Sequence, residues 1–361
     1  MSDHIPFHIQ EEIMKRLLVK SLVQFRSVSK TWKSLIDSSD FIAAHSLHCH
    51  TQPHHLLVSY EYQPIDEDYV LFSKCYIDDD NFPQPMSVPT LPQSIKQLFL
   101  PRVIGSSRGL LCLYGSDPDS KAGMAVIWNP SIRKSIVVAD VPREPFFVDV
   151  LGEPSFGFGV CPVTSDPKIV VITQFCEYMV YTLSSGKWTS LSKNLPTIRI
   201  GLSFSAVVTG GFLYWSARSE DHKLITSFDV TNESFEVIDH PDSIAHYCLS
   251  KLGESLALLQ YGEAYNFSTV WIMEHHGSQR SFTKLFTIKT PHESIVGFSK
   301  NGIPIMQVTD DDDEHLPKLV VYEPHSEHNN VLEICPPVNF YFVDSYMETL
   351  FLLGWSDCSS Y

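Results

Sequence analysis

The stretch "VKSLVQFRSVSKTWKSLI", residues 19–36, differs in kind from nearly everything after residue 55. Its large apolar residues stand three and four positions apart, as they do on one face of a helix. Trp32, Leu35 and Ile36 form one such group, and Ser29 precedes them at a suitable N-cap position. The stretch therefore predicts short helices at the front of a chain whose remainder has another pattern.

The residues before this stretch predict another short helix. Ile5, Ile9, Ile13 and Leu17 recur every fourth residue, which places them along one helical face. Three or four helices in about 40 residues come close to the smallest size that sustains its own core. Either some large apolar side chains face outward as a protein-binding surface, or the helices form a cap packed on the rest of the chain. Periodicity alone does not choose between these two interpretations.

The remainder of the chain has the composition of strands. Runs of β-branched and aromatic residues are bounded by Gly, Pro, Asn or Asp, and no long amphipathic helix follows residue 50. The class expected for this part is all-β. The runs that carry the interpretation are "HHLLVSYEY", "GLLCLYG", "AVIW", "KIVVITQF", "MVYTL", "SAVVTGGFLYW", "LALLQY", "TVWIM" and "KLVVYE".

These strands repeat with a regular spacing. An apolar strand with an aromatic residue leads to a polar turn, a second strand and a Pro-containing exit, as in "VIWNPSIRKSIVVADVP", residues 126–142. The spacing leaves room for four short strands per repeat, the size of a propeller blade. A weaker copy, "YVLFSKCYIDDDNFP", would make six blades, and "METLFLLGW", residues 347–355, is expected to return and pair with the first blade. A β-sandwich is the alternative, but it does not require such a spacing. The matching aromatic residues, 43 to 53 positions apart, are Trp128, Tyr181, Phe228, Trp271 and Tyr322.

Composition excludes several classes of function. The 361 residues carry a formal net charge of −16, which argues against general binding to nucleic acid or to anionic membranes. The leader over residues 1–42 is slightly basic, so the negative charge lies in the body. No apolar run spans a bilayer, and the first residues do not form a secretory signal. The eight cysteines include no C-x-x-C pair, which favours reduced thiols in the cytosol or nucleus.

The leader resembles an F-box. In "IPFHIQEEIMKRLLVKSLVQFRSVSKTWKSLIDSSDF", residues 5–41, Ile5-Pro6 stands at the Leu-Pro position of the motif. Residues 16–22 match its middle and residues 25–32 match its Phe-Arg-x-Val-Ser-Lys-x-Trp end. Leu18 departs from the pattern, since the family usually has Pro there.

The resemblance implies docking on the Skp adaptor, and through it on cullin, in an SCF-type ubiquitin ligase. An interface of roughly 800 Å² per partner is expected, with Phe25 and Trp32 as anchors. The implied adaptor-binding residues are Ile5, Pro6, Ile9, Ile13, Leu17, Val19, Leu22, Phe25, Val28 and Trp32.

The body resembles the F-box-associated domain of plant F-box proteins, a relative in style of kelch propellers. The matching pieces include "GSSRGLLCL", "WNPSIRK", "FGFGVCPVTSDPKIVVI" and "LVVYEP". The expected organisation is F-box helices over residues 1–42, a junction over 43–55 and a six-bladed β-propeller over 56–361. The resemblance implies a non-catalytic receptor whose propeller captures a target protein for ubiquitination, with no cofactor. No loop can be assigned to the target. The alternatives are an F-box scaffold or decoy outside ubiquitination, and an enzyme built on the propeller.

Other motifs are interpreted as structural. The cluster from His45 to His55 has side chains that bind metals, but it lacks the firm ligand spacing of a zinc site. The acidic runs at 78–80 and 310–315 lack the alternating ligands of a calcium loop and are expected to be solvated hairpin tips. "GSSRG" lacks the ending of a phosphate loop, and no G-x-S-x-G elbow occurs. The aromatic residues at 188, 215, 271 and 322 are expected to pack between blades.

Overall fold

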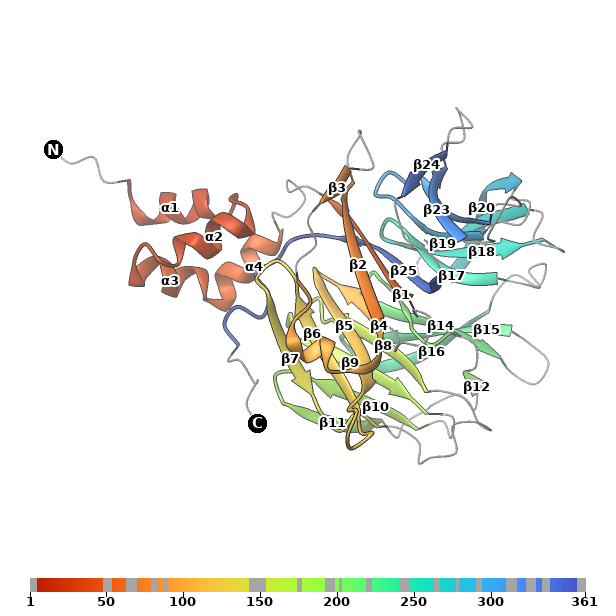
Figure 1. Ribbon diagram of the computed structural model, residues 1–361, viewed down its shortest axis with the longest axis horizontal. Helices are drawn as coiled ribbons and strands as arrows, with labels where there is room; N and C mark the ends of the chain where they lie inside the picture. Colours follow the sequence, from red (N-terminus) through yellow and green to blue (C-terminus); the bar gives the residue numbers. More distant parts are fainter. Residues whose placement is uncertain are drawn as a thin grey trace.

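The computed structural model places most of the chain in two regions, a helical bundle and a ring of sheets (Figure 1). The residues that it describes are 5–47, 54–62, 70–78, 84–86, 90–142, 154–173, 177–191, 199–200, 203–218, 223–239, 247–262, 267–276, 279–289, 294–309, 317–322, 329–332 and 338–355.

Four short helices form the bundle, which projects from one side of the ring (Figure 1). They are α1 (Phe7–Met14), α2 (Val19–Phe25), α3 (Lys30–Ile36) and α4 (Ser39–Leu47). The predicted cap of α3 is confirmed, because the Ser29 hydroxyl accepts a hydrogen bond from the Trp32 amide at 3.1 Å. At α4 the Ser38 hydroxyl accepts from the Phe41 amide at 3.3 Å, so Ser38, one residue before the helix, makes the contact that begins it.

Six antiparallel sheets make up the ring within the described residues. Five of them are built from consecutive strands, and the first two are β4 (Phe99–Ser107), β5 (Leu110–Ser116), β6 (Gly123–Asn129) and β7 (Lys134–Val138), then β8 (Ser155–Val160), β9 (Pro167–Ile172), β10 (Tyr178–Thr182) and β11 (Lys187–Leu191). The third consists of β12 (Arg199–Ile200), β13 (Val207–Thr209), β14 (Phe212–Arg218), β15 (Lys223–Asp229) and β16 (Ser234–Asp239). The fourth and fifth are β17 (Tyr247–Leu252), β18 (Ser255–Tyr261), β19 (Phe267–His276) and β20 (Gln279–Lys289), then β21 (Ser294–Phe298), β22 (Pro304–Thr309), β23 (Pro317–Tyr322) and β24 (Asn329–Leu332). A short helix, α5 (Gln93–Lys96), precedes β4.

The sixth sheet closes the ring with both ends of the β domain. It has the order β25-β1-β2-β3, from β1 (His55–Tyr62), β2 (Val70–Ile77), β3 (Gln84–Met86) and β25 (Val338–Tyr346). Val58 of β1 lies opposite Val343 of β25 in an antiparallel ladder. This pairing joins the two ends of the propeller. Because β1 and β25 hydrogen-bond to each other, neither strand leaves an open sheet edge on the side that faces the other. The closing strand is thus Val338–Tyr346, and the expectation that residues 347–355 form it is wrong, because they form turns.

The repeat found in the sequence corresponds to one position in each blade. Its aromatic residues fall on β6, β10, β15, β19 and β23, each the third strand outward from the ring axis. The weaker copy contains β2, the third strand of the closing sheet. The prediction of a six-bladed propeller after a helical leader is confirmed.

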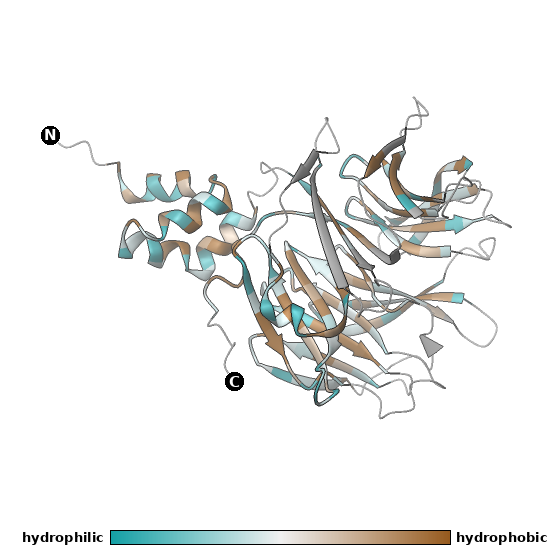
Figure 2. Cartoon of the chain, in the orientation of Figure 1, coloured by the Kyte–Doolittle hydropathy of each residue, from teal (hydrophilic) through white to brown (hydrophobic). Residues whose placement is uncertain are grey.

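Apolar side chains fill the spaces between neighbouring blades. On the third strand of its blade Trp128 packs toward the closing sheet, whereas its neighbour Ile127 packs toward β8–β11. Middle strands such as β5, β6 and β9 are thus buried on both faces, which explains why they are nearly continuous apolar runs. Figure 2 shows these hydrophobic stretches along the strands and a mixture of polar and apolar residues on the helices. Trp215 and Tyr322 lie in two further inter-blade clusters, as expected of structural aromatic residues.

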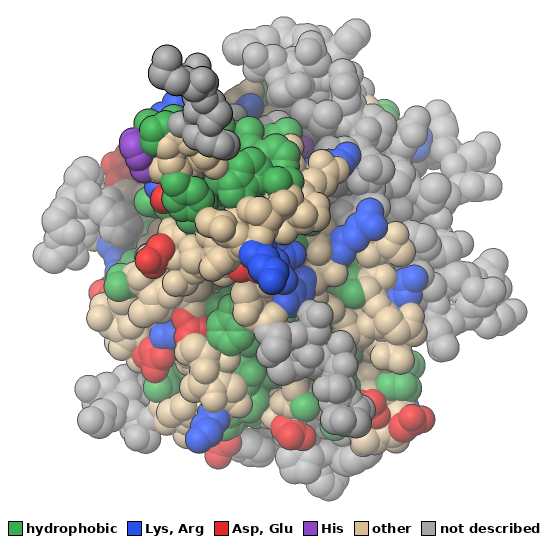
Figure 3. All heavy atoms as spheres, turned by 90° about the vertical axis from the view of Figure 1, so that its left-hand side faces the viewer, with side chains coloured by type: hydrophobic (Ala, Val, Ile, Leu, Met, Phe, Trp, Pro, Cys, Tyr) green, Lys and Arg blue, Asp and Glu red, His purple; other side chains and the backbone are tan. Residues whose placement is uncertain are grey.

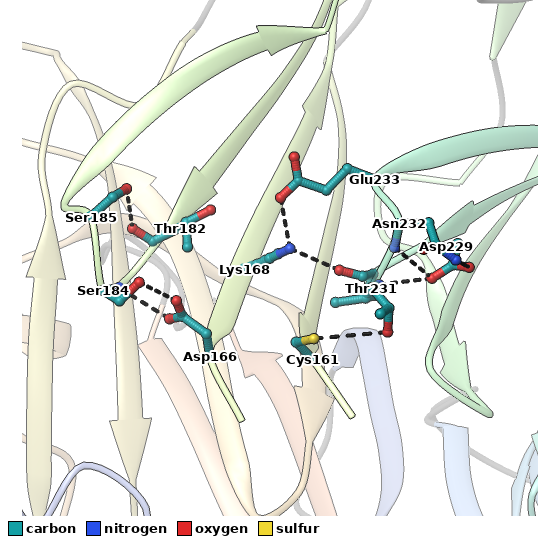
Figure 4. Close-up of polar contacts among 11 residues, drawn as sticks. Cys161, Asp166, Lys168, Thr182, Ser184, Ser185, Asp229, Thr231, Asn232 and Glu233 are labelled. Atoms are coloured by element: carbon teal, nitrogen blue, oxygen red, sulfur yellow. Dashed lines mark hydrogen bonds and ion pairs between the residues drawn. The ribbon is translucent and has the colours of Figure 1, made fainter. Parts of the chain in front are cut away.

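Polar contacts also join blades, as Figure 4 shows between β8–β11 and β14–β16. The ammonium of Lys168, which is buried on β9, lies 2.6 Å from a Glu233 carboxylate oxygen and donates to the Val230 carbonyl at 2.9 Å. Nearby, the Asp166 carboxylate accepts from the Ser184 amide at 3.0 Å. The Lys168 contacts pair a buried charge across the gap between two sheets, whereas the Asp166 contact joins two turns of one sheet.

The acidic run at 78–80 begins with a buried residue. Asp78 is not a solvated tip, because its carboxylate is buried and accepts a hydrogen bond from the Lys300 amide at 2.7 Å. The other residues of that acidic run, and the whole run at 310–315, lie outside the described residues. None of the described helices has the length and apolar character needed to cross a lipid bilayer.

Candidate functional site

An apolar ridge runs along the outer side of the helical bundle. Ile5, Ile9 and Ile13 are spaced four apart and are 42 to 53% exposed, far more than large apolar side chains of a core. Ile9 and Ile13 belong to α1, and Ile5 stands just before it. Leu18 and Val28, in the turns that flank α2, are also exposed. We call Ile5, Ile9, Ile13, Leu18 and Val28 the outer ridge.

The ten predicted adaptor-binding residues divide into three groups. Ile5, Pro6, Ile9, Ile13 and Val28 are exposed, and Leu17, Phe25 and Trp32 are half-buried. Val19 and Leu22 are 0% exposed and belong to the core of the bundle. In this conformation these two side chains hold the helices together, and their assignment as contact residues stays a prediction.

The two predicted anchors, Phe25 and Trp32, pack on each other. Their ring centroids are 5.3 Å apart, and the Trp32 indole donates to the Gln10 side-chain carbonyl at 3.0 Å. This bond links α3 to α1. Close by, the Arg26 guanidinium makes two contacts with the Asp37 carboxylate, at 2.6 and 3.0 Å, and so ties the ends of α2 and α3 together. The half-buried rings are therefore held in place before any partner arrives.

Basic side chains lie beside apolar side chains on this face of the molecule. Figure 3 views the end of the bundle and shows apolar side chains gathered beside a group of lysine and arginine side chains. The exposed basic residues of the helices are Arg16, Lys20, Lys30 and Lys33. An apolar patch with a charged rim is the usual composition of a protein-binding surface.

The inner side of the bundle is covered by the rest of the chain. Met14, Ile36, Phe41 and Ile42 share one apolar core with residues of β4–β11 and with residues 350–353 beyond the last strand. One side of the bundle thus shares an apolar core with the rest of the chain, and the other side exposes the outer ridge, whose role as a protein-binding surface stays a prediction.

The histidine cluster is dispersed in the structure. His45 is buried in α4, where its Nε2 lies 2.9 Å from the Leu17 carbonyl oxygen. His55 is buried in β1 beside the Tyr346 ring, and burial lowers the pKa of His55. Residues 48–50 lie outside the described part. Among the residues that the structure describes, no group of His, Cys, Asp and Glu is arranged to hold a metal ion.

Comparison with protein families identifies both regions. Residues 2–43 match the F-box domain, and residues 55–319 match the F-box associated beta propeller domain. The chain belongs to the F-box proteins with an F-box-associated β-propeller. An F-box implies binding to a Skp-type adaptor, and proteins of this family are generally non-catalytic adaptors.

Curated relatives resemble this F-box protein over most of its length. The F-box/kelch-repeat protein At3g23880 of Arabidopsis thaliana is 25% identical and covers 79% of this chain and 79% of its own. The F-box protein CPR1 of the same plant is 26% identical over 82% of this chain and 75% of its own. F-box protein At2g21930 is 27% identical over 78% and 72%.

Sequence reasoning missed some residues of the F-box surroundings. Met14 is almost fully buried in the bundle core, although it lies off the stripe of every fourth residue. Residues 347–355 were expected to form a strand and instead contact the bundle. The apolar composition of this segment indicated that it is buried. It did not distinguish a strand from a packed turn, because both require apolar residues when they are buried.

Proposed function

We propose that this F-box protein is a substrate-recognition subunit of an SCF-type ubiquitin ligase. In this proposal the outer ridge docks on the Skp adaptor, which connects it to cullin, and the propeller captures a target protein. The observation that carries the proposal is the outer ridge itself. The chain buries the other side of the bundle against its own propeller, yet leaves Ile5, Ile9 and Ile13 uncovered.

Burial of the ridge would supply much of the adaptor's binding energy. Removal of apolar surface from water contributes roughly 25 cal/mol per Å², and an interface of about 800 Å² per partner is ordinary. Phe25 and Trp32 remain candidate anchors, because their half-buried rings are already fixed by packing and by the Gln10 hydrogen bond. Ordered anchors lose little conformational entropy on binding.

The propeller is proposed to present the target by proximity. Its closed ring is a stiff scaffold, and loops on such scaffolds commonly carry recognition. A target held beside a ubiquitin-charged enzyme reacts as if the step were intramolecular. The chain then needs to contribute position and no catalytic group of its own.

The test uses charges placed on the ridge. Ile9→Asp and Ile13→Asp change exposed side chains and should leave the bundle folded, whereas Leu22→Asp would place a charge in the core. Val163→Asp is the matched control, because Val163 is an exposed apolar residue on the propeller. In pull-downs with a recombinant Skp adaptor, the wild type and Val163→Asp should retain the adaptor, and the ridge variants should lose at least about tenfold in affinity.

Two results would count against the proposal. Unchanged adaptor binding by both ridge variants, with normal helical circular dichroism, would reject the ridge as the docking surface. Adaptor binding without any target that becomes ubiquitinated in the reconstituted ligase, or accumulates when the proteasome is inhibited, would favour the scaffold or decoy alternative.

A further inference from the structure

The segment after the last strand lies between the two regions of the molecule. Met347–Trp355 leaves β25, follows the turns of blade β4–β7 and reaches the helices, where Figure 1 shows the blue end of the chain. Residues 349–353 are all buried, although none belongs to a helix or strand. We call Met347–Trp355 the strap.

Side chains of the turn that follows β6 hold the strap on its propeller side. The buried Asn129 amide donates to two strap carbonyl groups, of Thr349 at 3.0 Å and of Phe351 at 2.6 Å. The Ser131 hydroxyl accepts from the Thr349 amide at 3.1 Å. The Lys134 ammonium donates to the carbonyl of Trp355, at the far end of the strap. The strap forms no β-ladder, so these backbone groups of the strap find their hydrogen-bond partners among side chains at one turn of the blade.

A second turn of the same blade is shaped to let the strap pass. Gly109, between β4 and β5, has φ +74, and a Cβ there would lie 2.3 Å from the Met347 carbonyl oxygen and 2.6 Å from Thr349 Cγ2. Gly253, in the equivalent turn between β17 and β18, also has a positive φ but has nothing within 4 Å of such a Cβ. The close approach at Gly109 is therefore made to the strap, and Gly253 has no comparable neighbour.

On its other side the strap contacts the bundle. Leu350, Phe351, Leu352 and Leu353 share a core with Phe41 and Ile42 of α4 and with Ile36 of α3. Burial raises the pKa of Glu348, and the nearby Lys20 of α2 opposes that shift, so a strap carboxylate faces a helix cation. Gly354 lies against the Asp37 carbonyl, at the end of α3.

The strap's own backbone is constrained by these contacts. Leu352 has φ +72, a left-handed conformation that non-glycine residues seldom adopt. Such a conformation persists where surrounding contacts determine it more strongly than local preference does. Side chains from both regions surround this residue in the shared core.

We propose that the strap is a positioning element, which holds the F-box helices at one fixed angle on blade β4–β7. The hydrogen bonds of Asn129 anchor it to the blade, and its leucines form the contact with α3 and α4. An adaptor bound to the outer ridge then stands at a constant direction from anything bound to the propeller. That last consequence rests on the proposed function, whereas the fixed angle itself does not.

The decisive variant is Asn129→Asp. The carboxylate keeps the acceptor that receives the Ser131 amide at 2.9 Å, but it replaces the donor to the strap with an oxygen facing two carbonyl groups. The blade should tolerate Asp, because Asp229 occupies the equivalent turn position after β15 and accepts from the Thr231 amide at 2.7 Å. The substitution is therefore aimed at the strap and spares the turn.

The angle is measured by energy transfer between dyes on unnatural residues placed at Ser34 of α3 and Lys187 of β11, both exposed. The wild type should give one narrow distance distribution, and Asn129→Asp should broaden it about twofold or more, since weakly held domains move freely. Gly109→Ala should broaden it too, whereas Gly253→Ala, also at a positive φ but with no strap beside it, should not. Narrow distributions in both strap variants would overturn the proposal.

A measurement on the wild type covers the case in which a variant unfolds. The amides of Thr349 and Leu353 should exchange with solvent no faster than those of the neighbouring blade strands, because the strap opens only with the packed core. Exchange at the rate of a free peptide would overturn the proposal without any substitution.

The functional consequence is tested separately. In the reconstituted ligase, Asn129→Asp should bind the adaptor as the wild type does but transfer ubiquitin about tenfold more slowly, because position is lost. Failure of the wild type to bind the adaptor would refute the proposed function and leave the distance result standing. A broadened distribution with unchanged transfer would refute the positioning role of the strap.

Discussion

The helical bundle and the propeller bury their apolar residues in different ways. Each blade of the propeller finds a neighbour on both sides, because β1 pairs with β25 and closes the ring. The bundle has no such closure. One side shares a core with the strap and two blades, and the other side exposes the outer ridge. The comparison shows that a closed repeat can complete its core within one chain, whereas a small helical unit depends on what covers it.

The two regions also differ in how they use polar contacts. Between blades, the Lys168 ammonium belongs to a side chain that is 8% exposed and meets Glu233, which is 34% exposed. In the bundle, Arg26 and Asp37 pair near the surface, each about a quarter exposed. A buried pair resists separation more strongly than an exposed one, because an unpaired charge in the interior is costly. The propeller should therefore lose more stability than the bundle when a single ionic partner is removed.

The largest expected effect comes from matched core deletions. Leu22 of α2 and Leu258 of β18 are both 0% exposed, and truncation of either to Ala should cost about 2–5 kcal/mol. In Leu22→Ala the loss should appear as local unfolding of the bundle, with faster hydrogen exchange in α1 to α4 and a propeller transition near that of the wild type. In Leu258→Ala the main thermal transition should fall. If Leu22→Ala lowers the propeller transition equally, the two regions are one cooperative unit and the contrast fails.

The next effect concerns the paired charge in the ring. Glu233→Ala leaves the Lys168 ammonium buried with only the Val230 carbonyl, and should destabilise the propeller by about 2–4 kcal/mol in chemical denaturation. Lys168→Met combined with Glu233→Ala should recover part of that loss, because the unpaired charge is gone. A double variant less stable than Glu233→Ala would contradict this explanation. Asp37→Ala in the bundle is the comparison, and its cost should be smaller.

A smaller effect is expected at the helix cap. Ser29→Ala removes the acceptor of the Trp32 amide at the start of α3, and should cost about 1 kcal/mol of bundle stability. Hydrogen exchange at the Trp32 amide should rise while exchange in β18 and β19 stays constant. Ser29→Asp, which supplies another cap acceptor, should restore most of the protection, and failure to do so would argue against a capping role.

The smallest effect is expected at Leu18. This residue has φ −62, close to the angle that proline fixes, and stands where the F-box motif usually has Pro. Leu18→Pro should therefore stabilise the bundle by about 0.4–1 kcal/mol through the unfolded state. Thermal unfolding of α1 to α4, followed by exchange, is the measurement. A loss of more than about 1 kcal/mol would show that the turn between α1 and α2 has a geometry that proline cannot follow.

Much of the architecture could be predicted from local pattern. The five members of the aromatic repeat each fall on the third strand of a blade, because a strand buried on both faces requires a continuous apolar run wherever it lies. The cap at Ser29 was also predictable, since its acceptor lies three residues from the amide it serves. Interactions within a few residues leave their mark on a short stretch of sequence.

The candidate site was predictable in outline and less so in detail. The motif indicated the helical bundle as the docking region, but it did not separate the exposed Ile9 and Ile13 from the buried Val19 and Leu22. All four are apolar residues at helical spacing, and helical spacing records that a side chain avoids water without recording which neighbour covers it.

By itself, the sequence determined the two classes of structure, five clear repeats of the propeller and the family, because periodicity, turn residues and motif order are local properties. The tertiary structure alone decided which apolar side chains of the bundle face outward and what residues 347–355 do. Asn129 meets Thr349 across 220 residues of chain, and no local pattern encodes a partner at that distance. The packing of whole helices and strands decided these contacts. A backbone carbonyl can accept from any suitable donor and a leucine can pack on any apolar surface, so the particular partner is set only in the folded chain.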